Sequence, residues 1–414
     1  MRRWWPLTLR GSGAAVLAGA SLVIAQRAGI PELMYFGVLM TALLAIAAAT
    51  LVIARRTDRV TRSVSPDVTD VGARAEVVVR VGLQTALPTA PGRWADGLPA
   101  GLSGHANGVF PATSSSLGRD TVPVELRYEI VGLERGVHAL GPLEVVTTDP
   151  FGLVRRRFAL GRPTPVTVAP AIVDLPPLPP TGGEAGGTRQ SAALQLGQGL
   201  DNLVARPYAP GDSMRRIHWR ATAHRDTLMV RQEEQESSPA ATVVFDRALS
   251  RWSPAAAEGA GRDLAFETAV SACVSAVARL VHEGYTVDVV DSDGELLADP
   301  VDGGEDAEAR ALAASFAAIT ARTEGSTARV IPASAAVMMG PVVAITADPA
   351  RDHALVPGAF AQRSALPIMI MVAPHPDLEP ARAAGWRVAS VRPGGDIAAA
   401  WSDATERGLA DVGR

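Results

Sequence analysis

Two long uncharged runs open the chain, ahead of any alternating pattern. Residues 33–54 contain no charged side chain over 22 residues, and a helix rising about 1.5 Å per residue spans roughly 30 Å over that length, the hydrocarbon thickness of a bilayer. Residues 11–26 form a shorter uncharged run. This run is long enough to span if the flanking Arg10 and Arg27 extend their charged heads to the membrane surfaces. The pattern predicts a two-helix transmembrane hairpin within residues 1–62.

A cleaved signal peptide is the alternative for the first run, with Ala18-Gly19-Ala20 as its cleavage site. We favour the hairpin because a second and longer apolar segment follows the first at once.

The arginines around these runs predict the orientation of the hairpin. The loop between the runs contains only Arg27, whereas both outer flanks are rich in arginine, with Arg2, Arg3 and Arg10 before the hairpin and Arg55, Arg56, Arg59 and Arg62 after it. Positive residues concentrate on the cytoplasmic side of a membrane. We therefore expect an inner-membrane protein whose two ends, and hence its soluble domains, lie in the cytoplasm.

Alternation with a period of two follows the hairpin. Runs rich in β-branched residues are separated by turn-rich pieces, as antiparallel strands require; the clearest runs are residues 75–83, 122–130 and 143–148. No segment at helical spacing interrupts residues 63–170, so a β-sandwich-like domain is predicted there. Its last turn, Asp149–Gly152, is expected to place Phe151 as an apolar plug.

Residues 171–200 are rich in proline and glycine and predict a linker that is first stiff and then flexible. From residue 240 onward, continuous apolar runs alternate with segments at helical spacing. This combination predicts an α/β domain over residues 240–414, with a parallel, doubly wound sheet covered on both faces. Such sheets bind ligands at the carboxyl ends of their strands, which points to Asp246 and Asp348.

Composition and charge narrow the chemistry. All 39 basic residues are arginine, so no lysine can serve in a P-loop or form a Schiff base. Cys273 is the single cysteine, which excludes an intrachain disulfide and a multi-cysteine zinc site. The net charge is −4, and residues 1–62 contain eight arginines and two acids, so the remaining chain carries −10. An acidic body disfavours generic binding of nucleic acid.

One segment, residues 201–239, stands out from the alanine- and valine-rich remainder. Its arginines accompany two histidines and a tryptophan, and an acidic run follows. The spacing of His218 and His224 does not match the i, i+4 pair of a helical zinc motif, and no candidate nucleophile has a catalytic context. We therefore expect no enzyme activity.

This segment, read as YAPGDSMRRIHWRATAHRDTLMVRQEEQE, resembles the hallmark of the bacterial DUF58 family, a domain of unknown function. RGVHALGPLEVVTTDPFGL at residues 135–153 resembles a second signature of that family. The resemblance implies a membrane-anchored protein with a β-rich region and a fold similar to the von Willebrand factor A domain. It also implies a MoxR-type AAA+ ATPase as a partner, because family members are often encoded beside one.

An A-domain also suggests a metal site. The Asp-x-Ser-x-Ser motif of such domains is matched here by Asp246 and Ser250, with Ala248 at the middle serine and Arg247 adding positive charge nearby. Together with Asp348, these residues form a degenerate set for Mg²⁺, which prefers near-octahedral oxygen ligands. The alternative is that Asp246 and Ser250 cap the following turn.

Three hypotheses remain for the arginine-rich segment. In the first, Asp212, Glu233 and Glu234 pair with the arginines, and Trp219 packs between the soluble domains. In the second, the segment is a docking surface, because arginine and tryptophan are enriched at interaction hot spots. In the third, it binds phosphate or nucleic acid, which the acidic body disfavours.

We expect a non-catalytic interaction or scaffold protein with an unidentified client, whose docking or domain-coupling residues are Asp212, Arg215, Arg216, His218, Trp219 and Arg220. A divalent-cation-dependent binding module is the alternative.

Overall fold

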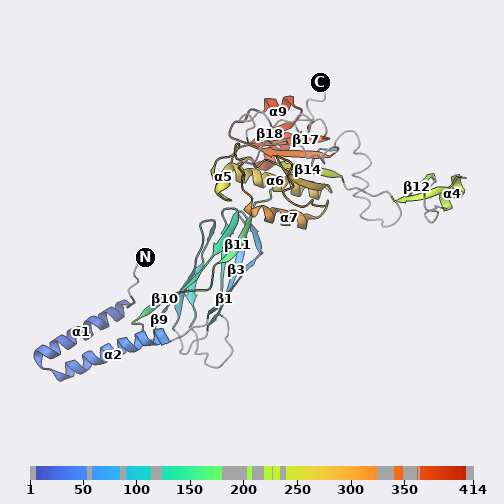
Figure 1. Cartoon of the computed structure of the whole chain (residues 1–414). Coiled ribbons are helices and arrows are strands. Elements are labelled where there is room, and N and C mark those ends of the chain that lie inside the picture. Colours follow the sequence, from blue (N-terminus) through green and yellow to red (C-terminus); the bar gives the residue numbers. More distant parts are fainter. Residues whose placement is uncertain are drawn as a thin grey trace. The chain divides into compact units, whose positions relative to one another are not determined.

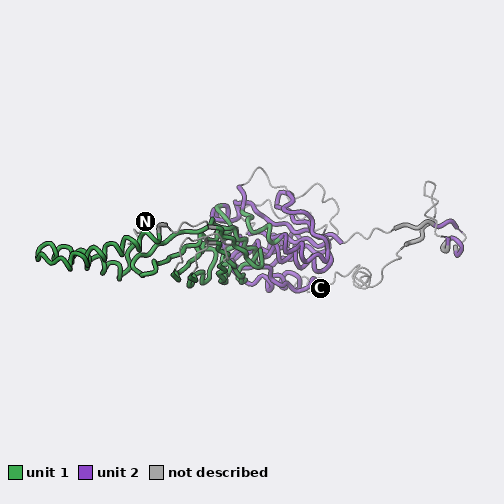
Figure 2. Tube along the Cα trace, turned by 90° about the horizontal axis from the view of Figure 1, so that it is seen from below, with its two compact units in different colours: residues 1–171, 258–262, 313–320 green, residues 172–257, 263–312, 321–414 purple. Residues whose placement is uncertain are grey.

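A computed structural model describes most of the chain, namely residues 6–53, 58–83, 90–112, 124–179, 203–207, 219–225, 227–233, 239–323, 340–347, 361 and 364–406. The chain forms two compact units, which Figure 2 colours separately. Unit 1 contains residues 1–171 together with 258–262 and 313–320, and unit 2 contains the rest.

Unit 1 begins with a helical hairpin. Helices α1 (Leu9–Ala28) and α2 (Pro31–Ile53) lie side by side (Figure 1). Gly29 ends α1 in the left-handed conformation that glycine adopts without steric cost. Both helices are long and apolar enough to cross a membrane, in agreement with the predicted hairpin. A third helix, α6 (Leu264–His282), also meets those criteria, but it is two-thirds buried and belongs to the core of unit 2.

The β-strands of unit 1 form two four-stranded sheets and a smaller third one. The first sheet has the order β1 (Asp58–Ser65), β3 (Arg74–Leu83), β7 (Val124–Gly132), β5 (Leu102–Gly104). The second has the order β10 (Arg155–Leu160), β9 (Leu143–Thr148), β4 (Gly92–Asp96), β6 (Asn107–Phe110). The third joins β2 (Val68–Asp70), β11 (Thr164–Ala169) and β8 (Gly136–Leu140). The two larger sheets contribute to one core, as expected of a sandwich.

Strand β3 shows why this sequence folds as a sandwich. Val77, Val79 and Val81 are fully buried, whereas the residues between them point outward. Arg80 is one of the outward residues and forms an ion pair on the sheet surface with Glu125 of β7. This two-residue period gives each strand one apolar face toward the core.

A polar triad lies within the sandwich. Arg62 of β1 donates two hydrogen bonds of 2.9 Å to the carboxylate of Asp96 in β4, and both side chains are almost completely buried. Tyr128 of β7 donates to the same carboxylate at 2.7 Å. Burial and the hydrogen bond to Asp96 raise the pKa of Tyr128. Because β1 and β7 belong to one sheet and β4 to the other, the triad joins the two sheets through charged groups.

Unit 2 contains a five-stranded parallel sheet. Its order is β15 (Thr286–Asp291), β14 (Ala240–Phe245), β16 (Pro341–Thr346), β17 (Leu366–Val372), β18 (Arg387–Val391). Helix α6 covers one face, where the rings of Phe245 and Phe266 lie 5.5 Å apart. The other face has a separate apolar cluster that includes Met371 and Trp386. The remaining elements are α5 (Ala255–Glu258), α7 (Asp306–Ser315), α9 (Glu379–Ala383), α10 (Ile397–Glu406) and, in unit 1, the 3-10 turn η2 (Phe316–Ala318).

The first part of the expected linker lies against helices of unit 2. Backbone atoms of residues 173–178 exchange hydrogen bonds with side chains of α6, namely Ser275 at 2.8 Å and Arg279 at 2.7 Å, and with Glu283 just after it at 2.7 Å. Trp401 of α10 donates its indole N–H to Pro176 O at 2.9 Å. Residues 172–179 are therefore an ordered part of unit 2.

Candidate functional site

The strand order of unit 2 marks one edge of the sheet for function. Numbered along the chain, its strands lie in the order 2-1-3-4-5. In such sheets, ligands bind outside the carboxyl ends of the strands where the order reverses, which here lies between β14 and β16. Asp246 follows β14 directly and Thr346 ends β16. The sequence prediction that Asp246 lies at a strand end is therefore confirmed.

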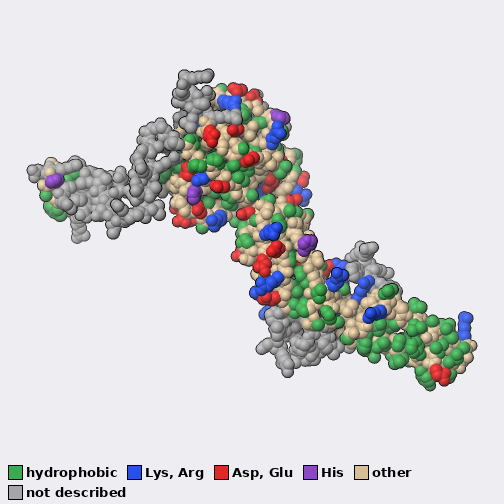
Figure 3. All heavy atoms as spheres, turned by 180° about the vertical axis from the view of Figure 1, so that it is seen from behind, with side chains coloured by type: hydrophobic (Ala, Val, Ile, Leu, Met, Phe, Trp, Pro, Cys, Tyr) green, Lys and Arg blue, Asp and Glu red, His purple; other side chains and the backbone are tan. Residues whose placement is uncertain are grey.

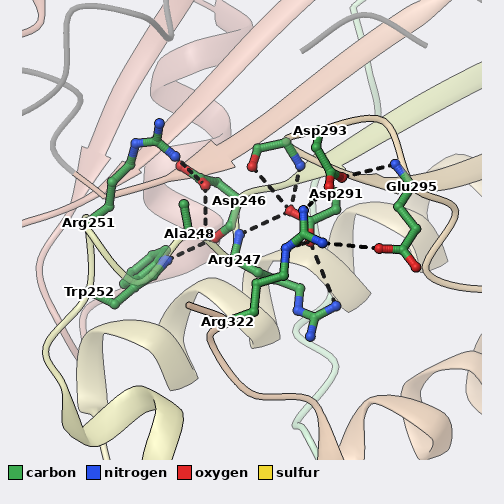
Figure 4. Close-up of polar contacts among 10 residues, drawn as sticks. Asp246, Arg247, Ala248, Arg251, Trp252, Asp291, Asp293, Glu295 and Arg322 are labelled. Atoms are coloured by element: carbon green, nitrogen blue, oxygen red, sulfur yellow. Dashed lines mark hydrogen bonds and ion pairs between the residues drawn. The ribbon is translucent and has the colours of Figure 1, made fainter. Parts of the chain in front are cut away.

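Both carboxylate oxygens of Asp246 accept hydrogen bonds from the protein. Figure 4 shows the bonds that Arg251 and Ala248 donate. Oδ1 accepts from Arg251 Nη1 at 2.5 Å and from Ala248 N at 3.1 Å. Oδ2 accepts from the hydroxyl of Thr346 at 2.6 Å. The side chains of Asp246 and Arg251 are 2% and 1% exposed, so this is a buried ion pair. Arg251 supplies a positive charge at the carboxylate from within the chain.

A second cluster surrounds Asp291 at the end of β15. Arg322 Nε lies 3.0 Å from Asp291 Oδ2, and its other nitrogens pair with Asp293 and Glu295 (Figure 4). The Arg322 backbone also pairs with the segment after β14, since Arg322 N donates to Arg247 O and Leu249 N donates to Arg322 O, both at 2.9 Å. The carboxylates at this edge thus meet arginine side chains.

The pKa values of buried Asp291 and exposed Asp293 are shifted in opposite directions. Burial raises the pKa of Asp291, against the opposing effects of the Ser292 N–H and of the Arg322 and Arg247 charges. For Asp293, burial is outweighed by the hydrogen bond from Arg322, and its pKa is lowered. The pKa of Arg322 is raised because its contacts with Asp293 and Asp291 outweigh desolvation. The arginines therefore compensate the charge of Asp293 fully but that of Asp291 only in part.

The expected Mg²⁺ ligands do not fit the ion as they are arranged. Asp246 already uses both oxygens, and Arg251 brings a positive charge to the position where a cation would bind. Ser250 is exposed, and Asp348 lies outside the described residues. Among the residues that the structure describes, no group of three or more His, Cys, Asp or Glu side chains is placed to bind a metal. Mg²⁺ binding stays a prediction.

The arginine-rich segment belongs to a small module of its own. Strands β12 (Leu203–Pro207) and β13 (Met229–Glu233) pair antiparallel, and helix α4 (Trp219–Arg225) lies between them in sequence. Thr222 of α4 accepts from Met229 N at 3.0 Å, and Met229 is buried. Helix and hairpin therefore contact each other within this module.

Only part of the predicted docking set can be placed. Trp219, the first residue of α4, is 69% exposed. Arg220 follows it in the helix, but its side chain is not described, and four members lie outside the described residues: Asp212, Arg215, Arg216 and His218. The choice among the three hypotheses for the segment therefore stays open at those positions.

Sequence reasoning missed Arg251, Arg322 and Thr346. Arg251 lies five residues after Asp246, and the only available signal was an arginine within the turn that follows a buried strand. Arg322 is distant in sequence and reaches the site through a parallel bridge to Ala248. In the turn after β15, Gly294 N donates to Asp291 O at 2.9 Å and Asp291 N donates to Glu295 O at 2.8 Å.

A family model matches part of the chain. Residues 204–334 match the family model described as "Protein of unknown function DUF58". No curated protein matches the chain. Among solved structures, the cohesin module from the Clostridium perfringens ATCC13124 family 33 glycoside hydrolase aligns with 28% of this chain and 98% of its own, at 15% identity and a TM-score of 0.18. That similarity is too low to assign a fold or a function.

Proposed function

We propose, from the match of residues 204–334 to the DUF58 family model, that the chain is a membrane-anchored, non-catalytic interaction or scaffold protein. Exposed Trp219 supports the proposal most directly. A tryptophan that is 69% exposed at the start of a helix offers the large apolar contact that is typical of interaction hot spots.

We propose further that the module formed by β12, α4 and β13 is the docking element. Trp219 is exposed there, whereas Met229 beneath the helix is buried. Loss of the Trp219 side chain would therefore remove contact area without removing core. The adjacent arginines would add charge-assisted hydrogen bonds to carboxylates of a partner.

The proposed partner is a MoxR-type AAA+ ATPase, and the proposed task is assembly or remodelling of an envelope-associated client. The family resemblance is the basis of this choice. It requires the soluble domains to be cytoplasmic, as the arginine distribution around the hairpin predicts. We also propose that the α/β domain is similar to a von Willebrand factor A domain. A parallel sheet with an aspartate directly after its first strand supports that view.

Affinity purification of the full-length protein from native membranes tests the docking element. Trp219→Ala should lose the ATPase, identified by mass spectrometry, while wild type retains it. His224→Ala is the matched control, because His224 is exposed on the same helix and should not affect recovery. Both variants should melt within about 2 °C of wild type, since exposed substitutions usually change stability little. Equal ATPase recovery from all three proteins would refute docking through this module.

A further inference from the structure

One loop of the β-domain lies against the ends of both membrane helices. This interface loop, residues 149–154, connects β9 to β10. Thr8 N, just before α1, donates to Leu153 O at 2.9 Å, and Arg155 N donates to Pro6 O at 2.7 Å. Arg156 Nη1 donates to Leu51 O in the last turn of α2 at 2.7 Å. Since α1 begins and α2 ends at one membrane surface, the interface loop lies at the level of the lipid headgroups.

Close packing holds the interface loop against the helices. A side chain at Gly11 of α1 would place its Cβ 1.9 Å from Leu153 O, so only glycine permits this approach. Leu153 and Val154 share an apolar cluster with Ala47 and Leu51 of α2. These contacts between the interface loop and the two helices fix the position of the loop relative to the bilayer.

The buried carboxylate of Asp149 shapes the interface loop from inside. It accepts hydrogen bonds from the backbone N–H groups of Phe151 at 2.9 Å, Leu153 at 2.7 Å and Val154 at 2.5 Å. The expected plug role of Phe151 is wrong, because its side chain is 52% exposed. The organised loop presents a phenyl ring outward beside the membrane helices, where interfacial aromatic residues are commonly found.

Exposed arginines are adjacent in sequence to the contacts between the interface loop and the helices. Arg10 in the first turn of α1 is exposed, as are Arg155 and Arg156 at the start of β10. Figure 3 shows hydrophobic side chains over the two helices and arginines where the helices meet the β-domain. The carboxylates of Glu144 in β9 and Asp149 in the loop are engaged within the protein, since Asp149 accepts the loop N–H groups and Glu144 pairs with Arg157. The surface is therefore positive where phosphate groups of lipids lie.

We propose that Arg10 and Arg156, together with the interface loop, bind the headgroups of anionic phospholipids while Phe151 inserts at the boundary with the acyl chains. Arginine forms bidentate hydrogen bonds with phosphate. Anionic lipids attract basic residues at the membrane surface. The inference rests on the membrane anchoring in the proposed function and is independent of partner docking.

Fluorescence quenching in reconstituted vesicles tests the position of Phe151. The variant Phe151→Cys can be labelled selectively with a polarity-sensitive fluorophore, because the single native cysteine, Cys273, is buried. Nitroxide-labelled phosphatidylcholine should quench this probe strongly. A probe on Val137→Cys is the control, because Val137 is 57% exposed on β8 of the same β-domain and should stay unquenched. Equal quenching at both positions, or none at either, would overturn the insertion of Phe151.

The preference for anionic lipid is tested with nitroxide-labelled phosphatidylglycerol and phosphatidylcholine at equal mole fraction. Each arginine at an anionic surface should enrich phosphatidylglycerol by about fivefold, so its label should quench the probe at 151 more strongly. The double variant Arg10→Gln/Arg156→Gln should abolish the difference. Arg27→Gln, at the opposite end of α1, should preserve it, and Arg156→Lys should retain most of it. Equal quenching by both lipids in wild type would refute the proposal.

Carbonate extraction of the membranes separates this inference from its premise. Release of the protein by carbonate would refute anchoring and the inference together. Retention with no lipid preference would refute the inference alone, and the ATPase capture would be unaffected.

Discussion

Arg251 Nη1 lies 2.5 Å from Asp246 Oδ1 at the edge of the parallel sheet, with both side chains almost completely buried. The sheet thus contains a positively charged group of its own at the position where its fold would place a ligand. A buried ion pair is costly to desolvate, but removal of one partner leaves the other charge buried and uncompensated.

Arg251→Ala should therefore destabilise the protein strongly. The expected loss is about 3–5 kcal/mol, which lowers the melting temperature by about 10 °C for a domain of this size. Thermal unfolding of the full-length protein in detergent measures it. Arg382→Ala is the matched control, because Arg382 pairs with Glu379 on the surface and such pairs contribute little. Similar melting temperatures for wild type and Arg251→Ala would contradict the buried-pair account.

Mg²⁺ should not stabilise the wild-type protein. A ligand that binds only the folded state raises the melting temperature in proportion to the logarithm of its concentration. Both oxygens of Asp246 accept hydrogen bonds, from Arg251 and Thr346, and the buried positive charge of Arg251 opposes a second cation there. We expect less than about 1 °C of shift with about 5 mM Mg²⁺ in the same assay. A larger shift that Asp246→Asn abolishes would restore the cation-dependent binding module.

Asp263 should make stability depend on pH in the acidic range. It caps the start of α6 by accepting from Ala265 N and Phe266 N, and it also accepts from Ser253. Burial would raise the pKa of this carboxyl, but the hydrogen bonds from Ser253, Phe266 and Ala265 outweigh it and lower the pKa below 3.8. Its contribution is then complete above pH 3.8 and is lost as the pH falls through the folded pKa.

The measurement compares wild type with Asp263→Ala across pH. Near neutral pH the variant should melt about 3–6 °C lower, the cost of losing an N-cap and its additional bonds. This gap should close as the pH falls below the folded pKa. A gap that stays constant down to about pH 2.5 would mean that the ionised carboxylate is not what stabilises the helix start.

Tyr128→Phe should weaken the sandwich by removal of one donor to Asp96. A hydrogen bond to a charged group contributes about 1.5–3 kcal/mol, and Arg62 would remain as the partner of Asp96. Chemical unfolding followed by tryptophan fluorescence is suitable because Trp94 lies 5.7 Å from the Tyr128 ring. Glu125→Gln changes a solvent-exposed ion pair and should leave the transition nearly unchanged. If both variants unfold alike, the triad does not stabilise the core.

Local patterns predicted the elements, but they could not predict the polar partners. The alternation of apolar residues in 75–83 indicated a strand because a half-buried strand requires that period. The position of Asp246 followed from the end of a buried run. Arg322 could not be found this way, because it lies 74 positions after Ala248 and reaches that segment through tertiary pairing alone. Phe151 was misread because a single aromatic residue in a turn does not indicate which side faces solvent.

The buried contact of Arg135 limits where this protein can be truncated. It is 1% exposed in the β-domain and donates to the carbonyl of Phe316, which the chain supplies 181 residues later. A fragment ending at residue 171 would contain every strand of the sandwich and still lack residues 258–262 and 313–320 of its own compact unit. A buried guanidinium would lose an acceptor in that fragment. Expression of the soluble region should therefore keep residues 58–406 in one piece. Two later segments of the chain belong to the same compact unit as the β-domain, so no single cut in the sequence separates the two units.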